Sequence, residues 1–187
     1  MNANDKIFIE QDFSLNDKAK VNDKIFMQQN FSLNNKANAS DNFFMQQALL
    51  EARKAFSRGD VPVGALIVRD GEILSYGSDA KFSDPTEHAE IIAIRSCAKK
   101  FNHWNLSGCT LYVTLEPCPM CAGACVNSRI SRVVYGAKNY KSGAGGTLYN
   151  ILSDSRLNHV CKVQSGVMQN ECLEILQEYF LLRRKLR

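Results

Sequence analysis

Residues 110–124 read Thr110-Leu-Tyr-Val-Thr-Leu-Glu-Pro-Cys-Pro-Met-Cys-Ala-Gly-Ala124. The β-branched and aromatic residues of the first half are typical of a strand. Proline is favoured in the first turn of a helix, so Pro117 predicts a helix over residues 117–127. Cys118 and Cys121 then lie at the positive end of the helix dipole, which favours thiolate over thiol.

A second motif, His88-Ala89-Glu90, lies upstream of this stretch. One imidazole and two thiolates supply three of the four ligands of tetrahedral zinc, and a fourth position left to water is typical of a catalytic site. The sequence therefore predicts one Zn²⁺ held by His88, Cys118 and Cys121. We expect Glu90 to be the catalytic residue, carrying protons between the attacking water and a leaving amine.

The alternative is a structural zinc site, because paired cysteines with a distant histidine are common in such sites. A fourth protein ligand would close the site, and Cys125, His103 and His159 are available for that purpose. The carboxylate of Glu90 beside His88 favours the catalytic interpretation.

The composition is that of a globular protein. Of the 187 residues, 45% are hydrophobic and 22% are charged, as in ordinary domains. No apolar run reaches membrane-spanning length, and the N-terminus lacks the apolar core of a signal peptide. Of the seven cysteines, two are assigned to zinc, and we expect the others to be buried thiols in a cytoplasmic protein. The net charge of +4 is compatible with a nucleic-acid partner.

The first 40 residues contain a tandem repeat. Asn4-Asp-Lys-Ile-Phe8 returns as Asn22-Asp-Lys-Ile-Phe26 at an offset of 18 residues, and one further step reaches Phe44-Met-Gln-Gln47. Asparagine is abundant here and disfavours helix. We expect residues 1–40 to be a disordered tail, with an added docking helix as the alternative, and residues 41–187 to form the zinc-dependent domain.

From Asp41, the expected N-cap of the first helix, helical and strand patterns alternate. Helices are expected over residues 41–57, 88–99, 117–127 and 171–184, and strands over residues 63–68, 72–76, 109–115, 132–135 and 161–167, with a turn at Asp70-Gly71. The separation of the last two strands suits a parallel crossover rather than a hairpin, with a loop and a helix at residues 143–152. The predicted fold class is α/β, a three-layer α/β/α sandwich with a five-stranded mixed sheet.

Residues 42–187 carry four further motifs, namely Asp60-Val-Pro-Val-Gly-Ala65, Asp84-Pro-Thr-Glu-His-Ala-Glu90, Ser128-Arg-Ile130 and Val133-Val-Tyr-Gly-Ala137. Together with residues 110–124 they closely resemble the bacterial tRNA-specific adenosine deaminases of the cytidine and deoxycytidylate deaminase-like zinc superfamily. The resemblance implies a cytidine-deaminase-like fold, a homodimer, and hydrolytic conversion of the wobble adenosine of a tRNA anticodon to inosine. Neither DNA nor a membrane is expected as a partner.

The resemblance also implies that the C-terminal helix and the loop at Lys138–Lys141 hold the anticodon. The residues expected to contact substrate are Asp79, Ala89, Leu115, Asn139, Lys141, Arg183 and Arg184. The two arginines suit phosphates, although cations at a helix C-terminus are equally common without a ligand. Tyr179 and Phe180 suit base stacking, with a place in the core as the alternative.

Two residues depart from the family pattern. Asp79 stands where the family has the Asn of a Trp-Asn pair that holds the base edge, and a carboxylate accepts hydrogen bonds without donating them. Asn139 stands where many relatives carry Asp near the ribose 2′-hydroxyl, a group that distinguishes RNA from DNA. Asp79 keeps a second function open, zinc-dependent deamination of a free purine base or nucleotide such as guanine. A third, a zinc-stabilised RNA-binding module without catalysis, is disfavoured by Glu90.

Overall fold

The computed structural model describes residues 40–81 and 84–185. The predictions about the N-terminal tail and its repeat lie outside these residues. Within them, no helix combines the length and the apolar composition needed to cross a membrane.

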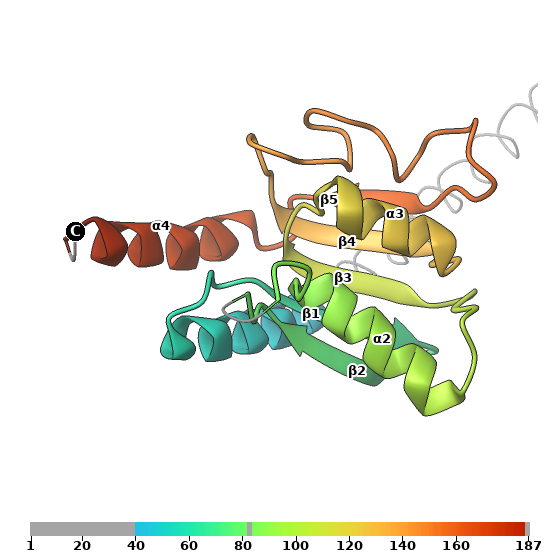
Figure 1. Cartoon of the computed structure of the whole chain (residues 1–187), viewed down its shortest axis with the longest axis horizontal. Coiled ribbons are helices and arrows are strands. Elements are labelled where there is room, and N and C mark those ends of the chain that lie inside the picture. The colour runs from blue at the N-terminus through green and yellow to red at the C-terminus, as the bar shows by residue number, and fades with distance from the viewer. Residues whose placement is uncertain (1–39, 82–83, 186–187) are drawn as a thin grey trace, which may run out of the picture. The chain divides into compact units, whose positions relative to one another are not determined.

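Five strands form one mixed sheet (Figure 1). In chain order they are β1 (Gly64–Arg69), β2 (Glu72–Ser78), β3 (Thr110–Leu115), β4 (Arg132–Ala137) and β5 (Lys162–Ser165). They lie in the order β2-β1-β3-β4-β5. β1 runs antiparallel to β2 and β3, whereas β3, β4 and β5 run parallel to one another. The predicted parallel pairing of the last two strands is confirmed.

Helices cover both faces of this sheet (Figure 1). On one face lie α2 (Ala89–Phe101) and α3 (Pro119–Asn127), and on the other lie the helix of residues 40–58 and α4 (Gln169–Lys185). Two glycines permit the closest approaches: a Cβ on Gly77 would clash with the backbone of α2, and a Cβ on Gly64 with the backbone of the helix of residues 40–58. The predicted three-layer α/β/α sandwich is confirmed.

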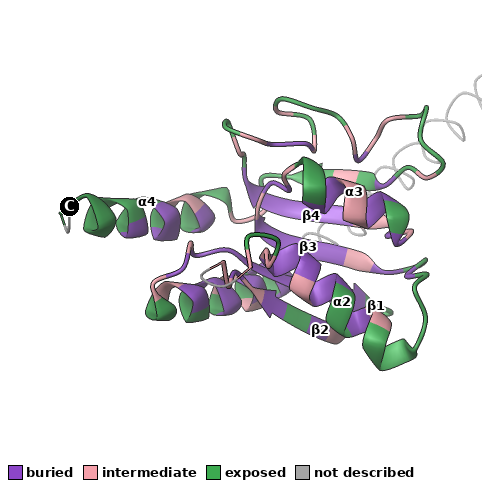
Figure 2. Cartoon of the chain, in the orientation of Figure 1, coloured by how far each residue is buried: buried purple, intermediate pink, exposed green. Residues whose placement is uncertain are grey.

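The central strands β3 and β4 are buried along almost their whole length (Figure 2). Because helices cover both of their faces, apolar residues follow one another in these strands instead of alternating with polar ones. Leu111, Val113, Val133 and Val134 are fully enclosed. This core fixes the ends of β3 and β4, from which the functional segments emerge.

The predicted turn at Asp70-Gly71 joins β1 to β2. Both residues have positive φ, 51° and 80°, as a two-residue hairpin turn of type I′ requires. The turn is confirmed, and it sets the register in which Arg69 pairs with Glu72; a shift between Ile67 and Val68 then moves the pairing of the two strands by one residue.

The start of α3 was predicted wrongly. The helix begins at Pro119, not at Pro117, and Cys118 is its N-cap with the extended angles φ −73° and ψ 172°. A residue that precedes proline is disfavoured in helical conformation, so Pro119 keeps Cys118 out of the helix. The general expectation that the cysteines lie at the positive end of a helix still applies.

Asp41 is not the N-cap of the first helix, because residue 40 is already helical. Its buried carboxylate instead accepts hydrogen bonds from Arg132 Nη1 and Nη2 at 2.8 and 2.7 Å and from Tyr112 Oη at 2.7 Å. Burial alone would raise the pKa of Asp41, but the bonds from Arg132 and Tyr112 outweigh it, so the pKa is lowered. This cluster ties the first helix to β3 and β4.

The helix expected at residues 143–152 is absent; turns occupy this part of the described chain. Its backbone amides are bound elsewhere: Ala144 N donates to Pro117 O at 2.8 Å, and Gly145 N donates to Glu116 Oε1 at 2.9 Å. Further along, Ile151 N donates to Ala144 O at 3.0 Å, whereas in a helix it would donate to the carbonyl group of Thr147.

Candidate metal centre

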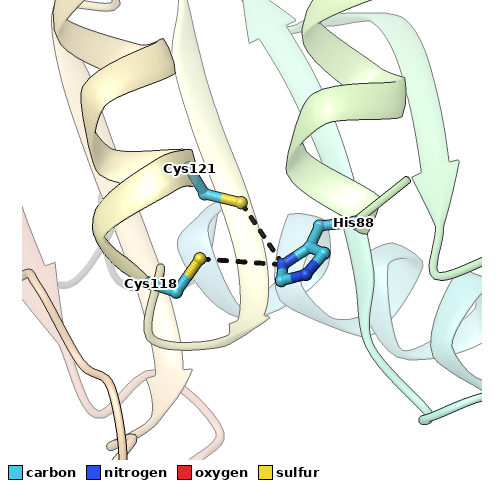
Figure 3. A group of neighbouring side chains, drawn as sticks. All are labelled: His88, Cys118 and Cys121. Atoms are coloured by element: carbon cyan, nitrogen blue, oxygen red, sulfur yellow. Dashed lines mark hydrogen bonds between the residues drawn. The ribbon is translucent and has the colours of Figure 1, made fainter. Parts of the chain in front are cut away.

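The first turns of α2 and α3 bring three side chains together (Figure 3). His88 is the N-cap of α2, Cys118 is the N-cap of α3, and Cys121 lies in the first turn of α3. Both N-cap residues have extended backbone angles, so the helical conformation begins only at the residue that follows each of them. The positive ends of two helix dipoles therefore meet where the thiolates lie, which favours negative charge there.

The ligand atoms have the separations of a tetrahedral metal site. His88 Nδ1 lies 3.7 Å from Cys118 Sγ and 3.5 Å from Cys121 Sγ (Figure 3). Zinc with ordinary bond lengths and tetrahedral angles would hold a nitrogen and a sulfur ligand about 3.6 Å apart. All three ligand atoms lie within 4.8 Å of one another. The donor set and its spacing fit zinc.

No fourth His, Cys, Asp or Glu joins this group within residues 40–81 and 84–185. His159 Nε2 pairs with Ile130 O at 2.7 Å, and His103 Nδ1 accepts from Asn105 N at 3.0 Å. Cys125 is fully buried, and burial raises the pKa of its thiol. Three protein ligands are typical of catalytic rather than structural zinc.

The two thiols of the centre differ in acidity. Hydrogen bonds from Cys121 and His88 lower the pKa of Cys118 to about 3, which makes it a thiolate. The pKa of Cys121 is raised, because its thiol donates to Cys118 and because it is buried. Metal binding would release this remaining proton, since zinc takes cysteine as thiolate.

Glu90 lies in the first turn of α2 and is only 3% exposed. Burial raises the pKa of this carboxyl group to about 7. Its Oε2 has no hydrogen-bond partner among the residues that the structure describes, and the residue is not part of the ligand group. Buried polar atoms normally have partners. A carboxyl oxygen without a partner, close in the chain to a metal ligand, is suited to form a hydrogen bond with a water that the metal would hold.

Asp79 lies against the start of α2 and is 1% exposed. Its Oδ1 accepts a hydrogen bond from Ala89 N at 2.8 Å. Lys81 Nζ lies 2.8 Å from Oδ2, in an ionic contact rather than an aligned hydrogen bond. Both carboxylate oxygens therefore have protein neighbours, and one of them satisfies a backbone amide at the N-terminus of the helix that carries Glu90.

Asn139 and Lys141 lie in the loop that follows β4. Asn139 Oδ1 accepts from Lys141 N and Ser142 N, both at 3.1 Å, so this side chain closes a turn within its own loop. Lys141 is exposed. Leu115 is half-buried at the end of β3, where it pairs with Ala137 of β4.

The predicted residues of the C-terminal helix line a cavity of about 520 Å³. Its lining residues are Val61, Lys141, Tyr179, Phe180, Arg183 and Arg184. Tyr179 is buried and donates to Gly59 O at 2.9 Å, whereas Phe180 is exposed. The structure thus brings Lys141 together with Arg183 and Arg184, and it assigns Tyr179 to packing.

Glu116 was not among the predicted site residues, although it directly precedes Pro117-Cys118. It is 1% exposed and accepts hydrogen bonds from the loop of residues 139–147. A carboxylate at the end of an apolar strand was the available signal, since charged residues are almost never fully buried without partners.

Comparisons with known proteins agree with this geometry. Residues 38–137 match the family described as the cytidine and deoxycytidylate deaminase zinc-binding region. A curated tRNA-specific adenosine deaminase of Bacillus subtilis (strain 168) is 46% identical over 140 residues, which are 74% of this chain and 87% of the relative.

Solved structures give the same grouping. A chain from work on A-to-I editing by tRNA:A34 deaminases at the wobble position has a TM-score of 0.68 at 42% identity, covering 72% of this chain and 99% of its own. A guanine deaminase from Bacillus subtilis has a TM-score of 0.51 at 37% identity, covering 56% of this chain and 69% of its own. The chain belongs to the zinc-dependent cytidine and deoxycytidylate deaminase family and, within it, to the tRNA-specific adenosine deaminases.

Proposed function

We propose that this protein hydrolyses the amino group of the wobble adenosine in a tRNA anticodon, which gives inosine and ammonia. The observation that carries the proposal is the buried carboxyl group of Glu90, whose Oε2 lacks a protein partner, in the same helix turn as a ligand of a three-residue metal centre. The tRNA specificity is supported by the 46% identity to a tRNA-specific adenosine deaminase.

Zinc held by His88, Cys118 and Cys121 would supply a water acidic enough to act as hydroxide near neutral pH. Glu90 would take a proton from the attacking water and deliver protons to the ring nitrogen and to the departing amino group. The C6–N6 bond breaks, a C6–O bond forms, and adenosine with water becomes inosine with ammonia. Burial of Glu90 excludes bulk water from this proton transfer.

The RNA would enter over the cavity between the loop after β4 and α4. Lys141, Arg183 and Arg184 offer three cations to the phosphate backbone, and such contacts supply most of the sequence-independent affinity for nucleic acid. The exposed ring of Phe180 suits stacking on a base. Asn139 would act through the turn that it closes before Lys141.

Around the base itself, we assign contacts to Ala89 and Leu115, which lie beside the metal ligands in sequence and at the end of β3 respectively. Asp79 would act on the base through Ala89, whose backbone amide it binds, rather than through its own carboxylate oxygens. We further propose a cytoplasmic homodimer. Its support is the family resemblance and a set of exposed apolar side chains between β4 and β5: Leu148, Tyr149, Leu157 and Val160.

A free purine such as guanine is the second candidate substrate. Its support is Asp79, because guanine carries hydrogen-bond donors that a carboxylate accepts, and the similarity to a guanine deaminase. The guanine deaminase is matched over a smaller share of this chain, 56% against 74% for the tRNA-specific relative. The partners of Asp79 within the protein also weaken this candidate.

One assay separates the two. The zinc-loaded protein is incubated with tRNA, with an anticodon stem–loop and with free adenine, adenosine and guanine, and inosine and ammonia are measured. Inosine in the two RNA substrates, without ammonia from free purines, supports the proposal, whereas ammonia from guanine alone refutes it. Glu90→Gln is the matched control: it should keep zinc and RNA binding while the rate falls at least about 10²-fold.

A further inference from the structure

Glu116 is a buried carboxylate that the proposed chemistry does not use. Its Oε1 accepts hydrogen bonds from Gly145 N at 2.9 Å and Thr147 N at 3.0 Å. Its Oε2 accepts from Asn139 N at 3.0 Å and from the Thr147 hydroxyl group. One side chain therefore holds both ends of the loop of residues 139–147.

This carboxylate has no cationic partner among the described residues. A buried charge without a counter-charge is costly unless several hydrogen bonds compensate it. All four hydrogen-bond donors to Glu116 come from a single loop, so the buried charge stays compensated only while that loop keeps its shape. Loop and carboxylate thus stabilise one another.

The fit between loop and carboxylate is close. A Cβ on Gly143 would clash with the carboxylate group of Glu116 and with Asn139 O. A second contact, Ala144 N to Pro117 O at 2.8 Å, joins the loop to the residue next to Cys118. The loop is therefore fastened at two successive positions, Glu116 and Pro117, directly before the first cysteine ligand.

The fastened loop carries Lys141 to the cavity that it lines with Arg183 and Arg184. Asn139 links Glu116 to Lys141: its backbone amide donates a hydrogen bond to Glu116, and its side chain accepts one from Lys141 N at 3.1 Å. We infer that Glu116 is a positioning residue, which fixes the RNA-binding cation Lys141 at a set place relative to the metal ligands. This inference rests on the proposed function.

Glu116→Gln tests the inference with little change of volume. An amide keeps one oxygen for Gly145 and Thr147, but it places an NH₂ group opposite the Asn139 amide, where two donors then face each other. The substitution therefore loosens the Asn139 end, next to Lys141, in particular. Glu72→Gln makes the same chemical change on an exposed residue of β2 and is the matched control.

Three measurements are made on zinc-loaded protein. Hydrogen exchange at the amides of residues 139–147 should quicken, while that of α3 and the zinc content stay unchanged. In a Glu90→Gln background, the Kd for tRNA should rise about tenfold, the order expected for one lost hydrogen bond to a charged group. In the active enzyme KM should rise by the same factor with little change in kcat, which a general loss of stability would not produce.

A double-mutant cycle with Lys141→Gln decides whether Glu116 acts through that cation. If it does, the combined variant binds tRNA no more weakly than the weaker single variant; additive losses would overturn the inference. An unchanged Kd despite quickened exchange would overturn it as well. If Glu116→Gln does not fold, Thr147→Val, which removes only one donor, replaces it in the same measurements.

Failure of the proposed function gives a different result. A protein with intact Glu116 that binds no tRNA refutes the RNA substrate, whatever the loop does. Unchanged exchange at residues 139–147 in Glu116→Gln refutes the fastening itself, whatever the substrate is.

Discussion

Asp79 offers the sharpest test of which residues recognise the base. The sequence predicts that its side chain contacts the base, whereas in the structure the side chain is bound by protein groups. In the structure its Oδ1 accepts from the buried amide of Ala89 at 2.8 Å, and Lys81 lies 2.8 Å from its Oδ2. The informative pair of substitutions is Asp79→Asn, which keeps an oxygen acceptor, and Asp79→Ala, which removes it.

The expected losses of stability differ. Asp79→Ala leaves the Ala89 amide buried without a partner, which costs about 1–3 kcal/mol. Asp79→Asn removes only the negative charge. Losing the interaction of that charge with the N-terminus of α2 costs about 0.3–1 kcal/mol, and losing the ion pair with the half-exposed Lys81 costs at most about 1 kcal/mol more. Urea unfolding of zinc-loaded protein, followed by circular dichroism, should therefore rank Asp79→Ala clearly below Asp79→Asn.

The effect on activity should be small in Asp79→Asn. Because both oxygens face protein groups, kcat/KM for the anticodon stem–loop should change less than about threefold, or roughly 0.6 kcal/mol. A change of tenfold or more at unchanged stability would refute this reasoning and show that the side chain faces the base. Its sign would then identify the substrate: a faster reaction with adenosine points to repulsion of the purine N7, and a slower reaction with guanine points to lost acceptance from guanine donors.

Three further predictions follow from other parts of the molecule. Asp41→Asn should cost about 1–3 kcal/mol at about pH 7. Since the pKa of Asp41 is lowered, its contribution is fully present above the ordinary value of 3.8 and is lost as the pH falls through the lowered pKa of the folded state, so the difference in unfolding temperature between the two proteins should shrink steadily below that value; a difference that stays constant there would contradict the reasoning. Replacing Arg183 and Arg184 with Gln should weaken tRNA binding and lower the slope of log affinity against log salt by about one to two units. An unchanged slope would mean that these arginines do not bind RNA phosphates and only complement the C-terminus of their helix. Deleting residues 1–39 should leave the melting temperature and the deamination rate nearly unchanged. If the repeat were aligned with the first helix, Asn30 would stand at the position of the enclosed Ala48, so the repeat cannot take the place of that helix in the core. A large loss of melting temperature or of deamination rate would favour a docked helix.

Much of the fold was predictable from the chain because local chemistry dominates there. The turn at Asp70-Gly71 needs two residues that tolerate positive φ, and the sequence shows them. Apolar runs in β3 and β4 indicated strands covered on both faces. The start of α3 was missed by two residues because two prolines stand close together, and only the effect of Pro119 on Cys118 decides between them.

The sequence by itself determined the metal centre, because ligand type and helix termini are local properties: His88, Cys118 and Cys121 supply three ligands suited to zinc. The tertiary structure alone decided what depends on contacts between distant segments. It gave Asp41 an ion pair instead of a helix cap, gave Asp79 the Ala89 amide, and filled residues 143–147 with turns instead of a helix. In each case a buried polar group took the nearest partner that the packing of the sheet and helices supplied, and sequence spacing does not reveal that partner.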